Sequence, residues 1–322
     1  MESPRGRSAR ARRGRRVPPA RRRALLYGVL AAVAVVGGAA AGTVYVTAGA
    51  HSAAPDVSSA ASAAVTGPAG SSGEAGVERV AGSGADRDAL LAGAMEAVAV
   101  ADGQEVSVAV LDPESGATAV YGDGTFDTAS IVKVDILAAL LLQAQDAGRE
   151  LTAAERAYAA AMIRNSDNAS ASALWRAIGR AAGLDAANER FGLTRTEGGD
   201  GMLWGLTRTT AADQLELLRT VFGTDSELDA ASRAYLQELM GHVAADQDWG
   251  VSAAGSAFAL KNGWLPRSTT GLWDVNSIGR VTAGGRACLV AVLSHGSATK
   301  AEGIALVEAA AKAAVPVVAT SA

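Results

Sequence analysis

The chain has 322 residues but only one cysteine and three histidines. A single cysteine, Cys288, excludes a disulfide within the chain, and its place in the apolar run "RACLVAVLS" favours a packing role. Three scattered histidines and one buried cysteine supply no cluster of ligands for a metalloenzyme. A serine–histidine–aspartate hydrolase also fits poorly, because no G-x-S-x-G elbow is present to pair with His295.

Basic residues are scarce outside the N-terminal stretch. Residues 1–23 hold ten of the 29 Lys and Arg residues and one of the 33 Asp and Glu residues. The remaining chain is therefore acidic, which argues against a nucleic-acid partner. Residues 24–46 carry no charge, and a helix of this length measures about 35 Å, enough to span a bilayer core. The arginines on one flank place that flank in the cytoplasm.

These features predict the domain organisation. In chain order we expect a basic cytoplasmic tail, a transmembrane anchor or signal segment, a flexible Ala/Ser/Gly linker, the folded domain and a short tail, at residues 1–23, 24–46, 47–84, 85–317 and 318–322. The folded domain would lie outside the cytoplasm, anchored in the cell membrane. The alternative is a protein secreted after cleavage near "TAGA" (47–50), with "RRRALL" (21–26) resembling a twin-arginine signal.

The hydrophobic pattern of the folded domain changes period along the chain. Alternating patterns predict strands early and late, at 105–112, 116–122, 257–264, 271–281 and 287–295. Helical patterns fill the middle, from Ser130 to about Leu239, and a last helix covers 300–315. We therefore predict an α/β (α+β) fold, with a mostly antiparallel five-stranded sheet flanked by helices and an inserted all-helical subdomain. A site in such a fold would lie between sheet and helices.

The stretch "TFDTASIVKVDIL" (125–137) places a lysine inside an almost wholly apolar helix. Ser130 stands at the helix start, where free backbone N–H groups favour developing negative charge. Lys133 follows three residues later on the same face, so its amine can reach the serine oxygen. Burial lowers a lysine pKa, and a neutral amine can take a proton from serine. The alternative is an N-cap serine beside a lysine that extends to solvent.

Two further motifs follow. "MIRNSDNASASALW" carries Ser166, Asp167 and Asn168 between helical segments, although these are also common helix-capping residues. "LKNGW" (260–264) is a strand with a second lysine and with a glycine of the kind that marks a close approach by backbone or ligand. Each motif alone is a weak signal.

Taken together, the three motifs resemble those of the penicillin-recognising serine hydrolases. These are the class A β-lactamases and the D,D-peptidases or penicillin-binding proteins, with signatures S-x-x-K, S-D-N and K-T-G. The resemblance covers about residues 85–317 and is closest to class A β-lactamase-like proteins. It implies that Ser130 attacks a carbonyl to form an acyl-enzyme and that Lys133 activates it. It also implies that Ser166 relays a proton to the leaving nitrogen, while Asn168 holds substrate and Lys133.

The resemblance extends to the third motif, with two departures. Lys261 would supply positive charge toward a substrate carboxylate, and Gly263 belongs to the substrate-binding strand. Asn262 replaces the usual threonine, and its amide is expected to reach a carboxylate. Trp264 is large where the family has a small residue, so a crowded cleft wall is expected. The oxyanion hole would use the backbone N–H groups of Ser130 and Trp264. No cofactor or metal is implied.

The main departure concerns deacylation. Class A enzymes carry a glutamate in an E-x-x-L-N phrase, which the matching stretch "GLTRTEGGDGMLWGL" (192–206) lacks. Glu197 is the only glutamate there and is the candidate general base for water. Its alternative is a solvated loop carboxylate.

Three functions therefore remain open. The first is a β-lactamase, the second is a D,D-carboxypeptidase that acts on peptidoglycan stem peptides, and the third is a non-catalytic binding module of the same fold. The expected partners are a small β-lactam or D-alanyl peptide and the membrane, with no nucleic acid, and we expect a monomer.

Overall fold

The computed structural model describes residues 78–319. The predicted basic tail (1–23), the predicted anchor (24–46) and most of the predicted linker lie outside the described residues. Within residues 78–319, no helix is both long and apolar enough to cross a membrane.

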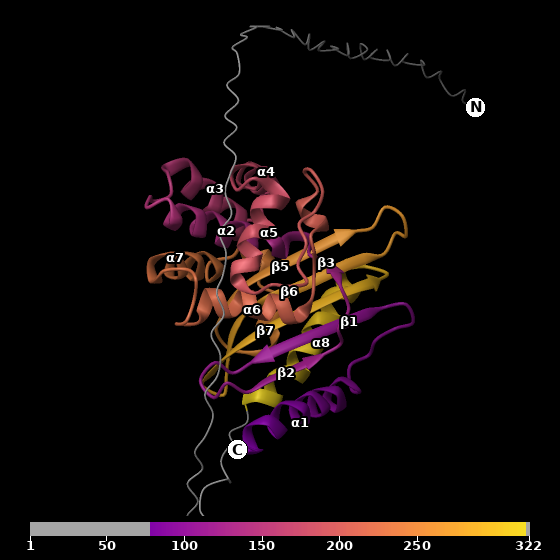
Figure 1. Ribbon diagram of the computed structural model, residues 1–322. Coiled ribbons are helices and arrows are strands. Elements are labelled where there is room, and N and C mark those ends of the chain that lie inside the picture. The colour runs from indigo at the N-terminus through magenta and orange to yellow at the C-terminus, as the bar shows by residue number, and fades with distance from the viewer. Residues whose placement is uncertain (1–77, 320–322) are drawn as a thin grey trace, which may run out of the picture. The chain divides into compact units, whose positions relative to one another are not determined.

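The centre of the fold is a five-stranded antiparallel sheet in the order β2-β1-β7-β6-β5 (Figure 1). Its strands are β1 Glu105–Leu111, β2 Thr118–Tyr121, β5 Phe258–Pro266, β6 Trp273–Ala283 and β7 Arg286–Ser297. The early hairpin joins the three late strands through β1 and β7, where Val108 lies opposite Val292. This confirms the predicted fold class. A second, two-stranded sheet pairs β3 (Phe126–Asp127) with β4 (Arg208–Thr209).

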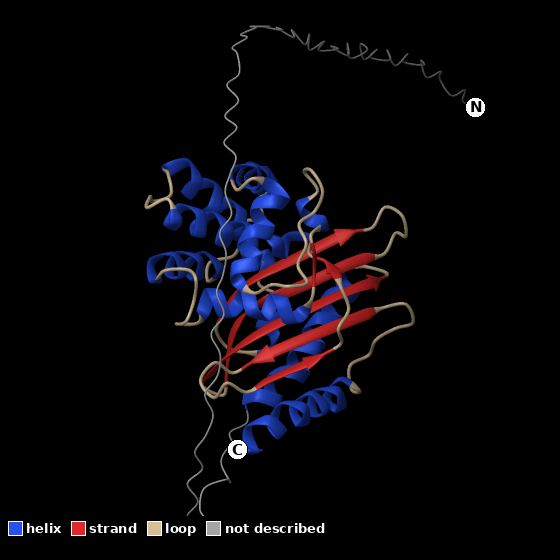
Figure 2. Cartoon of the chain, in the orientation of Figure 1, coloured by secondary structure: helices blue, strands red, loops and turns tan. Residues whose placement is uncertain are grey.

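Helices cover both faces of the sheet (Figure 2). One face carries the helical subdomain, which consists of α2 Val132–Asp146, α3 Ala153–Arg164, α4 Asn168–Ala177, α5 Arg180–Phe191, α6 Ala211–Phe222 and α7 Ala230–Met240. Helices α6 and α7 make its main contacts with the strands. The other face packs against α1 Glu78–Met95 and α8 Lys300–Ala319. The described part of the chain also contains short 3-10 turns at η1 Ala129–Ile131, η2 Trp204–Leu206, η3 Ala245–Gln247 and η4 Gly250–Ala254.

Two boundaries differ from the prediction. Helix α1 begins at Glu78, inside the segment predicted as linker. The small and polar residues of 78–84 show no hydrophobic period, so the sequence pattern does not indicate a helix there. Helix α8 continues past Pro316 to Ala319, beyond the predicted end at 315.

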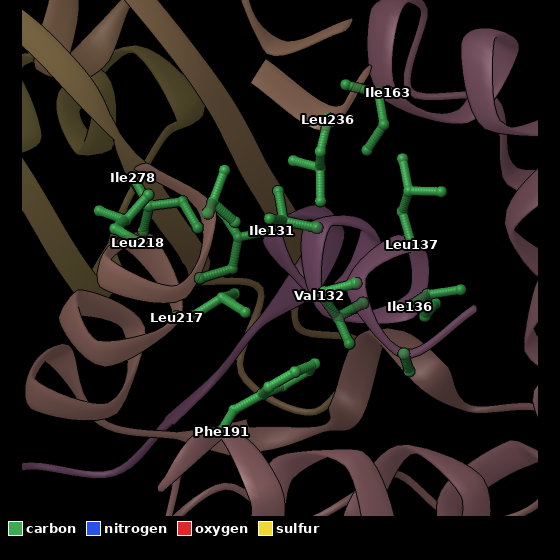
Figure 3. Close-up of a cluster of buried hydrophobic side chains, with 14 of the residues drawn as sticks. Ile131, Val132, Ile136, Leu137, Ile163, Phe191, Leu217, Leu218, Leu236 and Ile278 are labelled. Atoms are coloured by element: carbon green, nitrogen blue, oxygen red, sulfur yellow. The ribbon is translucent and has the colours of Figure 1, made fainter. Parts of the chain in front are cut away.

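Strand alternation divides the apolar core in two. Leu289, Ala291 and Leu293 of β7 face the helical subdomain, whereas Val290 and Val292 face α8. Cys288 is fully buried in the second of these cores. Helix α2 is the most buried helix of the first core. Its Val132, Ile136 and Leu137 belong to the same apolar cluster as residues of α3, α5, α6, α7 and β6 (Figure 3). The predicted burial of the apolar helix that carries Lys133 is thus confirmed.

Candidate active site

Ser130 lies in η1, directly before α2, and is partly exposed. The preceding Ala129 has φ 48°, in the left-handed region that non-glycine residues rarely adopt. Asn276 of β6 holds this turn, since its Nδ2 donates hydrogen bonds to the carbonyl oxygens of Asp127 (2.9 Å) and Thr128 (3.1 Å). Its Oδ1 accepts a hydrogen bond from the backbone N–H of Ser294 in the neighbouring strand β7, at 3.0 Å. The sheet therefore fixes the position of the serine.

Lys133 is fully buried, and its Nζ lies 3.0 Å from Ser130 Oγ. The amine also donates to the Ser166 carbonyl (2.7 Å), to Ser166 Oγ (3.0 Å) and to Asn168 Oδ1 (2.7 Å). Burial lowers the pKa of Lys133 to about 7, although the negative charge of Asp167 acts in the opposite direction. A large fraction of this lysine is then neutral near pH 7 and able to accept a proton.

Ser166 lies in the short connection between α3 and α4. It has φ 54°, and the next residue, Asp167, caps α4 by accepting a hydrogen bond from the Ser170 N–H at 2.6 Å. Asn168 is the first residue of α4. The S-D-N segment therefore caps a helix, which is the structural role that the sequence also allowed for these residues. The strained conformation of Ser166 at the same time directs both its carbonyl and its hydroxyl toward Lys133.

Lys261 of β5 reaches the same hydroxyl from the sheet. Its Nζ donates to Ser166 Oγ at 3.1 Å and to the Asn262 carbonyl at 2.9 Å, and the side chain is fully buried. Burial and the nearby charge of Lys133 hold its pKa well below the usual value. The three predicted motifs thus meet around one hydroxyl group, which lies between two lysine amines.

Gly263 brings the backbone of β5 against the Ser130 turn. A Cβ on this glycine would lie 2.7 Å from the Thr128 carbonyl oxygen and 2.8 Å from the Ser130 nitrogen. A residue with a side chain would therefore push the strand away from the serine. This close approach puts β5 beside the Ser130 N–H, as an oxyanion hole built from the two elements would require.

Asn262 and Trp264 correct the sequence-based expectations. Successive strand residues point to opposite faces, so these two side chains turn away from the face that carries Lys261. Asn262 is 1% exposed, and its Nδ2 donates to the carbonyls of Gln247 (2.9 Å) and Trp249 (2.8 Å). The Trp264 ring pairs with Trp249 (centroids 5.9 Å apart) and lies 3.8 Å from Lys300 Nζ. Both side chains therefore lie on the face of the sheet opposite Lys261, and not at the expected cleft wall beside Ser130.

Glu197 is not brought to this cluster. It is exposed and forms a backbone β-bridge with Arg208, and within residues 78–319 its carboxylate makes no hydrogen bond or ion pair. The residue of this loop that does contact the cluster is Trp204, whose ring centroid lies 4.9 Å from Lys133 Nζ. Sequence reasoning missed Trp204 and Asn276, because both act on residues distant in the chain.

Within residues 78–319, no group of three or more His, Cys, Asp and Glu side chains is arranged to hold a metal ion. The polar groups of this cluster are two amines (Lys133 and Lys261), two hydroxyls (Ser130 and Ser166) and an amide (Asn168).

The fold and the meeting of the three motifs define a member of the penicillin-recognising serine hydrolase superfamily. More specifically, the chain belongs to the β-lactamase enzyme family, whose model matches residues 142–318. This segment includes Ser166, Asn168 and Lys261. No curated protein sequence matches the chain.

Solved structures with a similar fold include both kinds of protein in this superfamily. A mutant of PBP-A in an acyl-enzyme complex with penicillin G is 20% identical, with TM-score 0.60, and the match covers 70% of this chain and 94% of that one. The extended-spectrum β-lactamase TLA-1 is 15% identical (TM-score 0.62; 73% and 99% covered). A class A β-lactamase from Bacteroides cellulosilyticus is 16% identical (TM-score 0.60; 72% and 97% covered).

Proposed function

We propose that this protein is a serine hydrolase that forms an acyl-enzyme through Ser130 with β-lactam amide bonds. The observation that carries the proposal is the 3.0 Å distance between Lys133 Nζ and Ser130 Oγ, combined with a lysine pKa of about 7. In the proposed step, Ser130 Oγ bonds to the lactam carbonyl carbon while its proton passes to Lys133 Nζ.

The leaving nitrogen then needs a proton. When the C–N bond of the tetrahedral intermediate breaks, the Ser166 hydroxyl is the proposed donor, because it contacts both Lys133 and Lys261. Protonated Lys133 then gives a proton to the Ser166 oxygen, so Ser166 regains its hydroxyl and the lysine returns to its neutral form. Asn168 Oδ1 holds the amine in position at 2.7 Å throughout. These steps leave an ester on Ser130 and a free amine in the opened ring.

Lys261 is proposed to attract the substrate carboxylate. Within residues 78–319, no carboxylate is hydrogen-bonded to its amine, which is buried and close to a second lysine. A negatively charged ligand group beside this amine would favour its protonated form and pair with it. The D-alanyl end of a peptide and the carboxylate of a penicillin share this feature.

The second candidate is a D,D-peptidase acting on peptidoglycan stem peptides. It is favoured by the position of Glu197, whose carboxylate makes no contact with Lys133 or Ser130. Without a carboxylate base at the acyl-enzyme, release of a β-lactam adduct would be slow. Either enzyme would work outside the membrane, and the proposed anchor at residues 24–46, beside the arginine-rich tail, is consistent with that location.

The test is intact mass spectrometry of the full chain, purified in detergent, over time with benzylpenicillin. We expect wild type to gain the mass of one benzylpenicillin and Ser130→Ala to gain none. A short-lived adduct favours the β-lactamase and a persistent adduct the D,D-peptidase. Equal labelling of both proteins, or no labelling of wild type at any time, would refute the proposed mechanism.

A further inference from the structure

The indole of Trp204 covers one side of the Lys133 amine. The ring centroid lies 4.9 Å from Lys133 Nζ, within the range of a cation–π contact. The amine's other near neighbours are the oxygen atoms of Ser130, Ser166 and Asn168, at 2.7–3.0 Å. The lysine side chain is 0% exposed. Between the oxygen atoms and the ring, the amine has no surface that faces solvent.

The loop that carries Trp204 is held firmly in place. Trp204 Nε1 donates to Ser172 Oγ of α4 at 3.1 Å, and the fully buried Trp175 of the same helix donates from Nε1 to the Gly201 carbonyl at 2.8 Å. A Cβ on Gly199 would collide with the carbonyl of Leu203, so the loop needs glycine there. Two indole donors from two different elements thus fix the ring over the lysine.

The loop is also joined to the turn that carries the nucleophile. The backbone N–H of Thr128 donates to the Thr207 carbonyl at 2.9 Å, and the Gly199 N–H donates to Thr207 Oγ1 at 3.1 Å. The positions of the ring, the lysine and Ser130 are therefore set by one connected network.

Release of an acyl group from Ser130 requires a water molecule and a base. The water oxygen bonds to the ester carbonyl carbon, its proton goes to the base, and the C–O bond to Ser130 breaks as the serine oxygen regains a proton. Lys133 is the basic group within hydrogen-bond distance of that oxygen, at 3.0 Å. Besides the oxygen atoms that accept its hydrogen bonds, the Trp204 ring is the neighbour described around the amine, so a water that reaches the amine must compete with the oxygen atoms or displace the ring.

We propose that Trp204 is a positioning residue that keeps water from the Lys133 amine and so prolongs the acyl-enzyme. This inference rests on the proposed function of Ser130. In this proposal two features lengthen the lifetime of the adduct: the Trp204 indole excludes water, and the Glu197 carboxylate does not contact Lys133 or Ser130.

The experiment compares Trp204→Phe, Trp204→Ala and Trp204→Gln with wild type, in the full chain, by intact mass after brief exposure to benzylpenicillin. Phenylalanine keeps an aromatic face and apolar bulk, so we expect an adduct lifetime within about twofold of wild type. Alanine and glutamine admit water, so we expect release at least about tenfold faster, which corresponds to about 1.4 kcal/mol in the barrier. The glutamine variant serves if the alanine variant fails to fold.

The pH profile separates this role from a merely structural one. Hydrating the amine relieves the desolvation that lowers its pKa, so the pH midpoint of acylation should move upward in Trp204→Ala and Trp204→Gln. It should stay in place in Trp204→Phe and in the control Leu203→Ala, whose side chain lies in the same loop and is 56% exposed.

The outcomes also separate the two proposals. No adduct on wild type would overturn the serine mechanism and this inference with it. An adduct on every variant, with the wild-type lifetime in both Trp204→Ala and Trp204→Gln, would overturn the role of Trp204 alone. Equal acceleration in Trp204→Phe and Leu203→Ala would also overturn it, because any disturbance of the loop would then have the same effect.

Discussion

Lys133 Nζ and Ser130 Oγ lie 3.0 Å apart, and the lysine is buried in the most apolar helix of the helical subdomain. This burial is what brings the pKa of Lys133 down to about 7. The same side chain would be fully protonated at neutral pH if it were exposed, and it could not then take a proton from serine.

Acylation should therefore depend on pH through this lysine. Below pH 7 the amine is protonated and cannot accept the serine proton, so the rate constant for labelling by a fluorescent penicillin should rise from pH 5 to pH 8. Lys133→Arg keeps a charged side chain and should lower this rate constant by at least about a hundredfold, the lower end of a typical general-base contribution. A flat profile in wild type would mean that another group takes the proton.

Asn276 should affect acylation without contacting the substrate. Its Nδ2 holds the carbonyls of Asp127 and Thr128, while its Oδ1 accepts from the Ser294 N–H at 3.0 Å. Asn276→Ala leaves buried backbone groups without partners, so we expect a loss of about 1–3 kcal/mol in the free energy of unfolding. We also expect a slower acylation step, because the Ser130 turn loses its connection to the sheet.

The comparison variant for Asn276 is Asn276→Asp, which keeps the acceptor for Ser294 but loses the donor to the turn. Denaturation and acylation rates are measured on both variants at 25 °C. If the aspartate variant acylates at the wild-type rate, the contact with the Asp127 and Thr128 carbonyls does not position the serine.

The sequence predicts the parts of this site that are close together in the chain. Ser130 and Lys133 are one helical turn apart, so helical spacing alone brings their side chains together. Asn276 is different, because its contacts with the turn span 148 and 149 residues and depend on how β6 lies beneath η1. No local pattern marks such a residue, apart from a polar side chain in the middle of a buried strand.

The errors at Asn262 and Trp264 have a local cause. A strand presents alternate residues to opposite faces, and the family motif, as a string of letters, does not contain that alternation. Once Lys261 faces Ser166, Asn262 and Trp264 must face the other side of the sheet, where Asn262 meets the carbonyls of Gln247 and Trp249 and Trp264 meets Lys300 of α8. Alternation does not tell whether Glu197 or Trp204 reaches the lysine, because both lie in a loop and a loop has no fixed period. Only the packing of the loop on Trp175 and Ser172 decides which side chain reaches the lysine.

Asp135 should make stability depend on pH. It lies two residues after Lys133 in α2 and is fully buried. Burial raises its pKa to about 7, against the hydrogen bonds from its own backbone and from Gln214, and the nearby charge of Asp213 acts in the same direction as burial. Between about pH 4 and pH 7 the folded state therefore holds a proton that the unfolded state has lost, so stability falls as the pH rises across this range.

Asparagine does not titrate, so Asp135→Asn removes the proton uptake that accompanies folding. Relative to wild type, its free energy of unfolding should improve between pH 5 and pH 8, by an amount on the order of a few kcal/mol. Urea denaturation of both proteins at four pH values measures the difference. Lys133 and Lys261 have lowered pKa values and act with the opposite slope, but they contribute equally to both proteins and cancel. A difference that stays constant with pH would show that Asp135 does not titrate in this range.

Gly263 should be required for the chemistry more than for folding. A Cβ there would lie 2.7–2.9 Å from backbone atoms of Thr128, Ser130 and Ile131, and rigid backbone cannot move aside as a flexible side chain would. β5 is an edge strand of the sheet, so Gly263→Ala can be accommodated by a shift of this strand away from Ser130. We expect acylation to slow by at least about tenfold, which corresponds to about 1.4 kcal/mol in the barrier.

The matched control is Gly93→Ala in α1, where a Cβ meets nothing within 4 Å. Alanine in a helix interior is favoured over glycine by about 0.5–1 kcal/mol, so this variant should be slightly more stable and should acylate at the wild-type rate. Labelling rates and urea denaturation are measured side by side on both variants. Wild-type acylation in Gly263→Ala would mean that the site tolerates a wider gap between β5 and Ser130, and that the close approach of the two backbones is not what organises the reaction.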